Sequence, residues 1–127
     1  MLKIIEVRTA PRPEGEYVVL QNEGLVSLSL CGWALCSESV FSPDSPDWSS
    51  SFYMFDHDVN IRPYTRVVLF TGSGEDGWVP TIDGKQAFLA YWNRRQSVWK
   101  NAQTIHILRL AGSRRVIQLN EPQLKEM

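Results

Sequence analysis

The chain has 127 residues and a formal net charge of −1 at pH 7, with 43% of its residues hydrophobic and 21% charged. This length fits one domain, since two domains would each be left with a marginal core. The ordinary composition excludes a low-complexity chain, and no apolar run approaches the ~20 residues of a membrane-spanning helix.

The first residues do not resemble a secretory signal. Their short apolar stretch is interrupted by Lys3 and Glu6, and no cleavage site follows it. We therefore expect a cytoplasmic protein, or an extracellular one if the chain is a fragment of a longer secreted protein.

Turn residues divide the chain into segments of strand length. Between clusters of Gly, Pro, Asn and Asp lie runs rich in β-branched and aromatic residues, which favour strands. The expected strands cover residues 2–7, 17–21, 51–55, 66–71, 86–91, 104–110 and 115–119. Short strands at regular spacing, without helical intervals, predict an all-β sandwich or barrel.

Three segments have patterns that differ from a simple apolar strand. Residues 26–30 alternate apolar residues with serine, which is the period of a strand. Residues 85–99 have mixed propensities, and we interpret them as a strand that ends near Trp92 and continues as a polar loop. Residues 105–119 predict a hairpin whose turn contains Gly112.

The two cysteines stand in one apolar segment. On a single strand Cys31 and Cys36 would point to opposite faces and could not form a disulfide. We expect both to be buried as small hydrophobic side chains with inert thiols.

Charge is distributed unevenly. Residues 1–60 contain three basic and nine acidic residues, whereas residues 61–127 contain ten basic and five acidic residues. An acidic side and a basic side are expected if the topology does not interleave the two halves.

Three separated segments resemble the lamin-tail domain family. Residues 15–35 read GEYVVLQNEGLVSLSLCGWAL and resemble the family's opening strand, glycine turn and Gly-Trp strand. Residues 61–74 read IRPYTRVVLFTGSG and are similar to its Ile-x-Pro turn, apolar strand and Gly-Ser-Gly loop. Residues 90–112 read AYWNRRQSVWKNAQTIHILRLAG and resemble its closing loop and hairpin, in the form of prokaryotic stand-alone members.

The resemblance implies an immunoglobulin-like β-sandwich at residues 1–120, followed by a C-terminal tail at 121–127. The core aromatic residues that it implies are Trp33, Phe55, Phe70 and Trp99. The sequence departs from the family pattern at 101–103, where Asn-Ala-Gln replaces the usual Asn-x-Gly-Asp loop. It also has a longer insert at 37–51, which we expect to be a variable loop.

One motif resembles a nucleotide loop. Residues 72–77 match Gly-x-Gly-x-x-Gly after an apolar strand, but Trp78 and Pro80 follow where a helix would be needed to hold a pyrophosphate. Glu75 and Asp76 would also repel phosphate. We interpret the segment as a surface turn.

The histidines do not stand in a recognisable catalytic or metal motif. His57 is surrounded by acids, but no twelve-residue calcium loop with a closing Glu is present, so we expect solvated loop acids. The acids concerned are Asp44, Asp47, Asp56 and Asp58. His106 is expected to be packed or half-exposed on its strand. We expect no catalytic residue, no metal and no cofactor.

A basic and aromatic cluster in the second half is a candidate binding surface. Its residues are Trp92, Arg94, Arg95, Lys100, Arg114 and Arg115. Interleaved aromatic and cationic side chains can stack on bases and contact phosphates. The alternative is that the aromatic residues belong to the core and the cations form a solvated rim.

Members of the family bind proteins, chromatin or DNA, or accompany hydrolases as accessory modules. The resemblance therefore implies a non-catalytic module of lamin-tail type that presents loops and sheet edges to a protein partner, with no membrane insertion. The alternative is nucleic-acid or polyanion binding through the Arg/Lys cluster of the second half. A small hydrolase or metal-dependent enzyme is the third hypothesis.

Overall fold

The structure is a computed structural model that describes residues 1–42, 44, 48–111 and 116–119. Within these residues the chain consists of strands, their connections and 3-10 segments of three or four residues, and it contains no α-helix. The all-β prediction is therefore confirmed. No helix in this part of the chain is long and apolar enough to cross a membrane.

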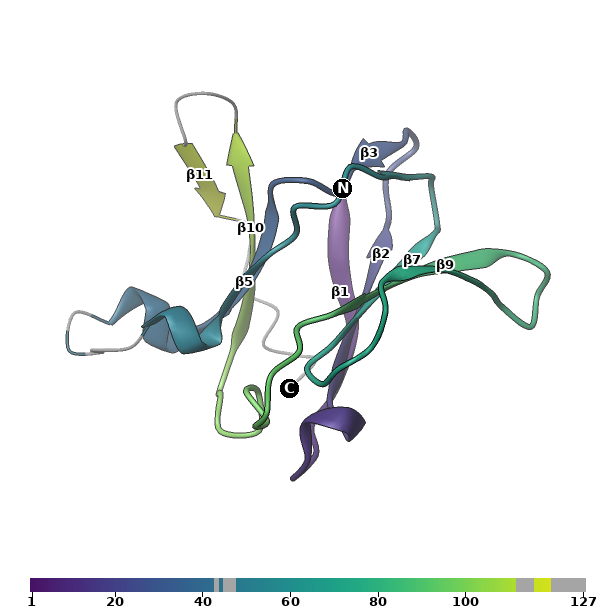
Figure 1. The fold of residues 1–127 in the computed structure, drawn as a ribbon. Coiled ribbons are helices and arrows are strands. Elements are labelled where there is room, and N and C mark those ends of the chain that lie inside the picture. The colour runs from purple at the N-terminus through teal and green to yellow at the C-terminus, as the bar shows by residue number, and fades with distance from the viewer. Residues whose placement is uncertain (43, 45–47, 112–115, 120–127) are drawn as a thin grey trace.

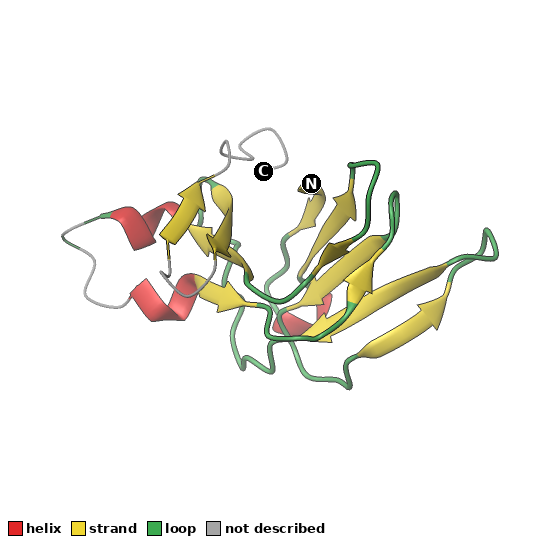
Figure 2. Ribbon diagram, turned by 90° about the horizontal axis from the view of Figure 1, so that it is seen from above, coloured by secondary structure: helices red, strands yellow, loops and turns green. Residues whose placement is uncertain are grey.

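Two larger sheets form the body of the molecule. The five-stranded sheet has the order β1 (Leu2–Arg8), β2 (Tyr17–Asn22), β7 (Arg66–Phe70), β9 (Gln86–Tyr91) and β8 (Gly77–Pro80). The four-stranded sheet has the order β11 (Val116–Leu119), β10 (Ile105–Ala111), β4 (Trp33–Ser37) and β5 (Phe52–Met54). A third, two-stranded sheet pairs β3 (Leu28–Ser29) with β6 (Asn60–Ile61). The 3-10 segments are η1 (Pro13–Gly15), η2 (Glu38–Phe41) and η3 (Trp48–Ser51). Figures 1 and 2 show the two larger sheets as separate layers.

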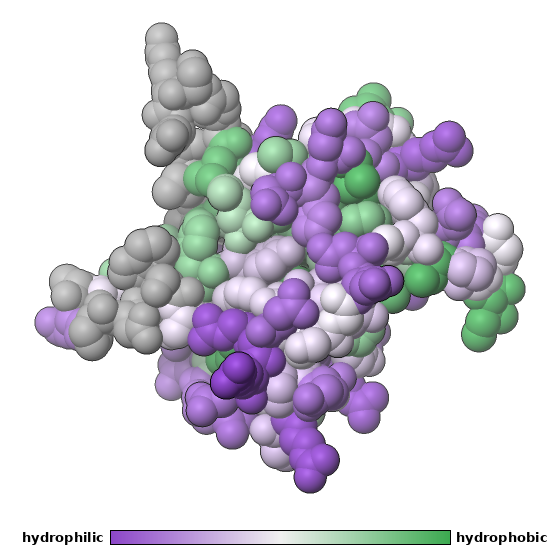
Figure 3. Space-filling model, in the orientation of Figure 1, coloured by the Kyte–Doolittle hydropathy of each residue, from purple (hydrophilic) through white to green (hydrophobic). Residues whose placement is uncertain are grey.

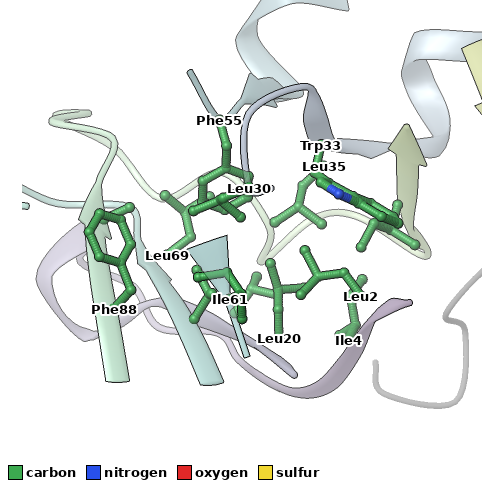
Figure 4. Packing of buried hydrophobic residues seen from close by; sticks show 14 of the residues in the cluster. Leu2, Ile4, Leu20, Leu30, Trp33, Leu35, Phe55, Ile61, Leu69 and Phe88 are labelled. Atoms are coloured by element: carbon green, nitrogen blue, oxygen red, sulfur yellow. The ribbon is translucent and has the colours of Figure 1, made fainter. Parts of the chain in front are cut away.

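The hydrophobic core lies between the two layers. In β7, Val67 and Leu69 are buried while residues 66, 68 and 70 are not, because successive side chains of a strand point to opposite faces. Figure 4 shows buried side chains of both sheets and of the segments between them meeting in one cluster. The labelled members are Leu2, Ile4, Leu20, Leu30, Trp33, Leu35, Phe55, Ile61, Leu69 and Phe88.

Three of the four aromatic residues expected in the core are buried as predicted. They are Trp33, Phe55 and Trp99. The prediction for Phe70 is wrong, because its side chain is half-buried on the outer face of β7. There the centroid of its ring lies 5.7 Å from that of Tyr17 and 5.0 Å from that of Tyr91. Phe70 is four residues after Arg66 in the same strand, so both side chains lie on the outer face.

Each segment expected to form a strand contains one, but the pattern missed β8 and the two-residue strand β6. The sequence of β8, Gly-Trp-Val-Pro, follows a glycine-rich loop and ends in a proline, so it resembles a turn. β7 and β9 pair in parallel, and the chain forms β8 at the sheet edge before it returns as β9. β10 and β11 form the expected antiparallel pair, and the turn at Gly112 lies outside the described residues. After β9 the chain continues without a helix, as predicted.

The segment that contains both cysteines does not form one continuous strand. Gly32 adopts a φ of +93° in a turn, and only β3 before it and β4 after it are extended. Cys31 is exposed in this turn, so the prediction that it is buried is wrong. Cys36 is buried in β4 as predicted, and burial raises the pKa of its thiol to about 12. Within 26–30 only Leu28–Ser29 form a strand and Val26 is exposed, so the alternation does not mark a strand over the whole segment.

Candidate functional site

The predicted basic cluster begins directly after β9, where Trp92 is half-buried. Its ring already contacts neighbouring side chains. The guanidinium carbon of Arg94 lies 5.2 Å from the Trp92 ring centroid, and the ring centroids of Tyr53 and Trp99 lie 5.3 and 5.6 Å away. These contacts favour the alternative in which Trp92 is part of the core.

The cations of the cluster do not all fall within the described residues. Arg95 and Lys100 are exposed, whereas Arg94 is partly buried over Trp92. Arg114 and Arg115 lie outside the described residues, so a single patch that joins all the cations stays a prediction.

A buried carboxylate that the sequence did not reveal fixes this part of the chain. Glu16 is fully buried, and its Oε1 accepts hydrogen bonds from the Thr71 hydroxyl and the Val98 amide, both at 2.7 Å. The Trp99 amide donates to both carboxylate oxygens at 3.1 Å. Hydrogen bonds to a charged acceptor are strong, so Glu16 holds the backbone of residues 98–99 close to the start of β2.

A groove of about 960 Å³ lies on a different part of the molecule. Its walls come from the end of β2 at Gln21, from residues 60–66, and from the β8–β9 hairpin between Trp78 and Ala87. Figure 1 shows this hairpin extending away from the body on the right of the molecule. Three segments that are distant in sequence therefore share one concave surface.

Asn22 organises the loops beside this groove. Its side chain is buried, and its Nδ2 donates to the carbonyls of Val26 and Ile61, both at 2.9 Å. Its Oδ1 accepts from the Gly24 amide at 2.9 Å. Its backbone carbonyl accepts from the Tyr64 amide at 2.6 Å. One residue therefore ties the 23–28 loop to the 61–65 turn, so both are held before any ligand arrives.

The tip of the β8–β9 hairpin is a tight turn with its own side-chain support. Gly84 adopts a φ of +80°, which suits glycine, and its amide donates to the Thr81 carbonyl. The Asp83 carboxylate accepts from the Thr81 hydroxyl and the Lys85 amide. The bond from the Thr81 hydroxyl contributes most to lowering the pKa of Asp83, followed by the bond from the Lys85 amide. The Asp83 carboxylate is therefore hydrogen-bonded within the turn.

The groove carries more positive than negative side chains. Arg62, Arg66 and Lys85 line it, against a single acid, Asp83. Among the described residues none of these three cations forms a salt bridge. Arg66 uses its Nε to donate to the Gln21 side chain at 3.2 Å, which leaves the outer nitrogens of its guanidinium for another acceptor.

Apolar side chains are exposed in and around the groove. Tyr64 is 56% exposed and Trp78 is 40% exposed, and both line it. Leu25 and Val26, on the loop that Asn22 holds, are 85% and 73% exposed, and Ile82 is fully exposed at the hairpin tip. Figure 3 shows hydrophobic surface at that tip, on the right, and above β3 at the top of the molecule. Exposed apolar patches rimmed by polar residues are typical of interaction sites.

The glycine-rich loop 72–77 connects β7 to β8 and does not open a helix, in agreement with the predicted surface turn. Its Asp76 makes specific contacts. One carboxylate oxygen lies 2.6 Å from His57 Nε2, and the other accepts from the Tyr91 amide at 2.8 Å. His57 thus fastens the 55–59 segment to this loop, while Asp56 and Asp58 are exposed as expected.

His106 is half-exposed on β10, as predicted. Its Nε2 lies 3.0 Å from the Thr104 hydroxyl, and its ring centroid lies 5.0 Å from that of Phe41 in the 37–51 insert. Burial lowers the pKa of His106, and the charge of Glu38 opposes this effect. In the described part of the chain, no group of three His, Cys, Asp or Glu side chains is arranged to hold a metal ion.

Sequence comparison adds no assignment to these sites. No family model matches the chain, and no curated protein is significantly similar to it.

Proposed function

We propose that the chain is a non-catalytic interaction module, with an immunoglobulin-like β-sandwich of lamin-tail type, that binds a protein partner through loops and sheet edges at one end. The observation that carries the proposal is the surface formed by the 23–28 loop, the 61–65 turn and the β8–β9 hairpin. It combines exposed apolar side chains with a preformed groove, and Asn22 holds two of its three segments in place. Protein interfaces of this kind use rigid aromatic anchors with a polar rim.

The resemblance of the three sequence segments to lamin-tail domains supports the finer fold assignment within the all-β architecture. The Asn of the GEYVVLQN segment is Asn22, so the residues that carry the resemblance include the one that organises this end of the molecule. The proposal that the module is non-catalytic follows from the same resemblance.

Backbone pairing at the β8 edge is restricted. The Thr81 amide donates inward to the Lys85 carbonyl at 2.8 Å, and successive amides of a strand point to opposite sides. The outward positions of β8 are therefore Trp78 and Pro80, and proline has no amide hydrogen. A partner is expected to engage the side chains around this edge rather than to extend the sheet.

The alternative of nucleic-acid or polyanion binding at Arg94, Arg95 and Lys100 has weaker support. The Trp92 ring that would stack on a base is occupied by the molecule's own side chains.

Site-specific photo-crosslinking in native cells tests the proposal. A photoreactive residue placed at Leu25 or at Ile82 is expected to give discrete adducts with a protein, because both side chains are exposed at the proposed surface. The matched control carries the same group at the exposed Glu14 in η1. This residue lies near the C-terminal end of β1, at the end of the molecule away from the 23–28 loop. Adducts that nuclease removes, or identical adducts from position 14, would overturn the proposal.

A further inference from the structure

We propose that the groove between the 60–66 segment and the β8–β9 hairpin holds an extended acidic segment of the partner protein. This inference rests on the proposed function and names the partner's chemistry. Arg62, Arg66 and Lys85 would pair with its carboxylates, while Tyr64 and Trp78 would contact its apolar side chains.

The groove has an excess of positive charge. The three cations come from three places, namely the turn after β6, the first residue of β7 and the first position after the hairpin turn. None has a salt-bridge partner among the described residues. The one acid in the wall, Asp83, keeps its negative charge while it accepts hydrogen bonds from Thr81 and the Lys85 amide, so three cations face one anion. Arginine pairs with carboxylates through two parallel hydrogen bonds, so two arginines favour a ligand with separate carboxylates.

The aromatic side chains supply a second argument. Trp78 contacts Phe88, whose ring centroid lies 5.3 Å away, and its side chain is 40% exposed and lines the groove. Tyr64 adopts a φ of +63°, and its amide is bound by the Asn22 carbonyl. Tyrosine and tryptophan have only two side-chain torsions, so on a fixed backbone they lose little conformational entropy on binding.

The dimensions of the groove fit a short peptide segment. Its volume of about 960 Å³ lies at the upper end of the roughly 300–1,000 Å³ found for ligand clefts. It is open rather than enclosed, since its walls are the surfaces of a loop and a hairpin. A peptide segment can therefore reach it from solvent.

An acidic peptide fits better than a nucleic acid. A nucleic acid carries a phosphate at every step, with one charge per about 1.7 Å of duplex axis. Two acids would oppose a continuous row of phosphates, namely Asp83 in the wall and Glu23, which accepts a hydrogen bond from the lining residue Gln21. A peptide can space its carboxylates to meet the cations and place neutral residues opposite these acids.

Selection from a library of short random peptides tests the inference on the purified full chain. The variant Arg62→Glu/Arg66→Glu/Lys85→Glu removes the positive charge of the groove. Its matched control is Arg8→Glu/Arg12→Glu/Lys100→Glu, which makes the same charge change at exposed positions that do not line the groove. A neutral variant, Arg62→Gln/Arg66→Gln/Lys85→Gln, serves if the charge reversal does not fold.

The enriched peptides are expected to be acidic, with interspersed apolar residues. Their Kd should rise about 30-fold or more in the groove variant, because three exposed ion pairs are lost together, and by less than about 3-fold in the control. The neutral variant should weaken binding in the same direction by a smaller factor. Binding should weaken as salt concentration increases.

Other results would overturn the inference in distinguishable ways. Enriched peptides that bind the groove variant with unchanged affinity, but lose affinity for Leu25→Asp/Val26→Asp, would leave the proposed function standing and remove the groove from it. A labelled oligothymidylate that binds more tightly than the peptides, with the same dependence on the three cations, would assign the groove to nucleic acid. A library without enrichment, together with no protein adducts at Leu25 or Ile82, would remove both proposals.

Discussion

Two regions of the molecule bring tryptophan and arginine together, and they do so with opposite results. Around Trp92, the guanidinium of Arg94 and the rings of Tyr53 and Trp99 contact the indole, so the region is packed. Around Trp78, the neighbouring cations have no salt-bridge partner among the described residues, and the indole is partly exposed beside a groove. The same residue types form a packing unit in one region and an open surface in the other.

A single buried polar side chain underlies each region. Glu16 binds the 98–99 backbone, and Asn22 binds the loops beside the groove. A buried polar group that is fully hydrogen-bonded fixes the backbone around it. The difference between the two regions therefore lies in what the fixed backbone presents, namely core aromatic residues in one case and exposed cations and aromatic residues in the other.

The largest expected effect separates the two tryptophan environments. Trp99→Ala should lower the free energy of unfolding by about 3–5 kcal/mol, since Trp99 is fully buried, whereas Trp78→Ala should cost less than about 1 kcal/mol. Urea denaturation followed by far-UV circular dichroism measures both. Equal losses would mean that Trp78 is as much a part of the core as Trp99.

The second prediction concerns the buried carboxylate. Glu16→Gln replaces one acceptor oxygen with an amide group that faces backbone donors, and it should cost about 2–3 kcal/mol of stability. The exposed Glu14, two residues earlier, supplies the control, and Glu14→Gln should change stability by less than about 0.5 kcal/mol. Similar urea midpoints for the two variants would contradict the structural role of Glu16.

A smaller loss of stability is expected when Arg94, which packs on Trp92, is replaced. Arg94→Ala should lower stability by about 0.5–1 kcal/mol, because the guanidinium of Arg94 lies over the Trp92 ring. Arg95→Ala, at the exposed neighbouring position, should leave stability unchanged. The comparison requires thermal or urea unfolding of the two variants side by side. A larger loss for Arg95→Ala would show that the contact at Trp92 is not the stabilising one.

The smallest effect is a pH dependence outside both regions. Burial lowers the pKa of His106 in the folded state, so the unfolded chain takes up a proton first. Stability from this group is present above the unfolded pKa of about 6.5 and is lost as pH falls towards the lower folded pKa. Unfolding of the wild type and of His106→Gln between about pH 7 and pH 5 should show the weaker pH dependence for the variant. An unchanged pH dependence would remove His106 as its source.

Local patterns in the sequence were sufficient for most of the fold. Apolar runs bounded by turn residues identified the strands, because strand formation and side-chain alternation are properties of neighbouring residues. The errors arose where tertiary structure decides. Phe70 is apolar, but its parity in β7 places it on the outer face. Cys31 stands in an apolar segment that the turn at Gly32 interrupts.

The candidate site was harder to predict than the fold. The predicted cluster contained Trp92, Arg94 and Arg95 because they are close together in the sequence. Their spacing does not show that other side chains of the molecule contact the indole. Arg62, Arg66 and Lys85 are separated along the chain, and the groove that joins them depends on β8, which resembled a turn. The local signals that were available are the two cations of the RPYTR segment and the Asp-Gly turn of the hairpin. Neither shows that the two segments face each other.

The proline at the end of β8 has a consequence for the behaviour of the protein in concentrated solution. A projecting hairpin with an open edge is a template on which a second copy could add a strand and begin to aggregate. Along the outer side of β8, Pro80 removes one of the two outward amide positions, and the strand is only four residues long. The hairpin can therefore expose an indole and an isoleucine to water while offering too few backbone donors for polymerisation. Pro80, which has no backbone amide hydrogen, therefore limits pairing at this edge while the side chains beside it stay accessible.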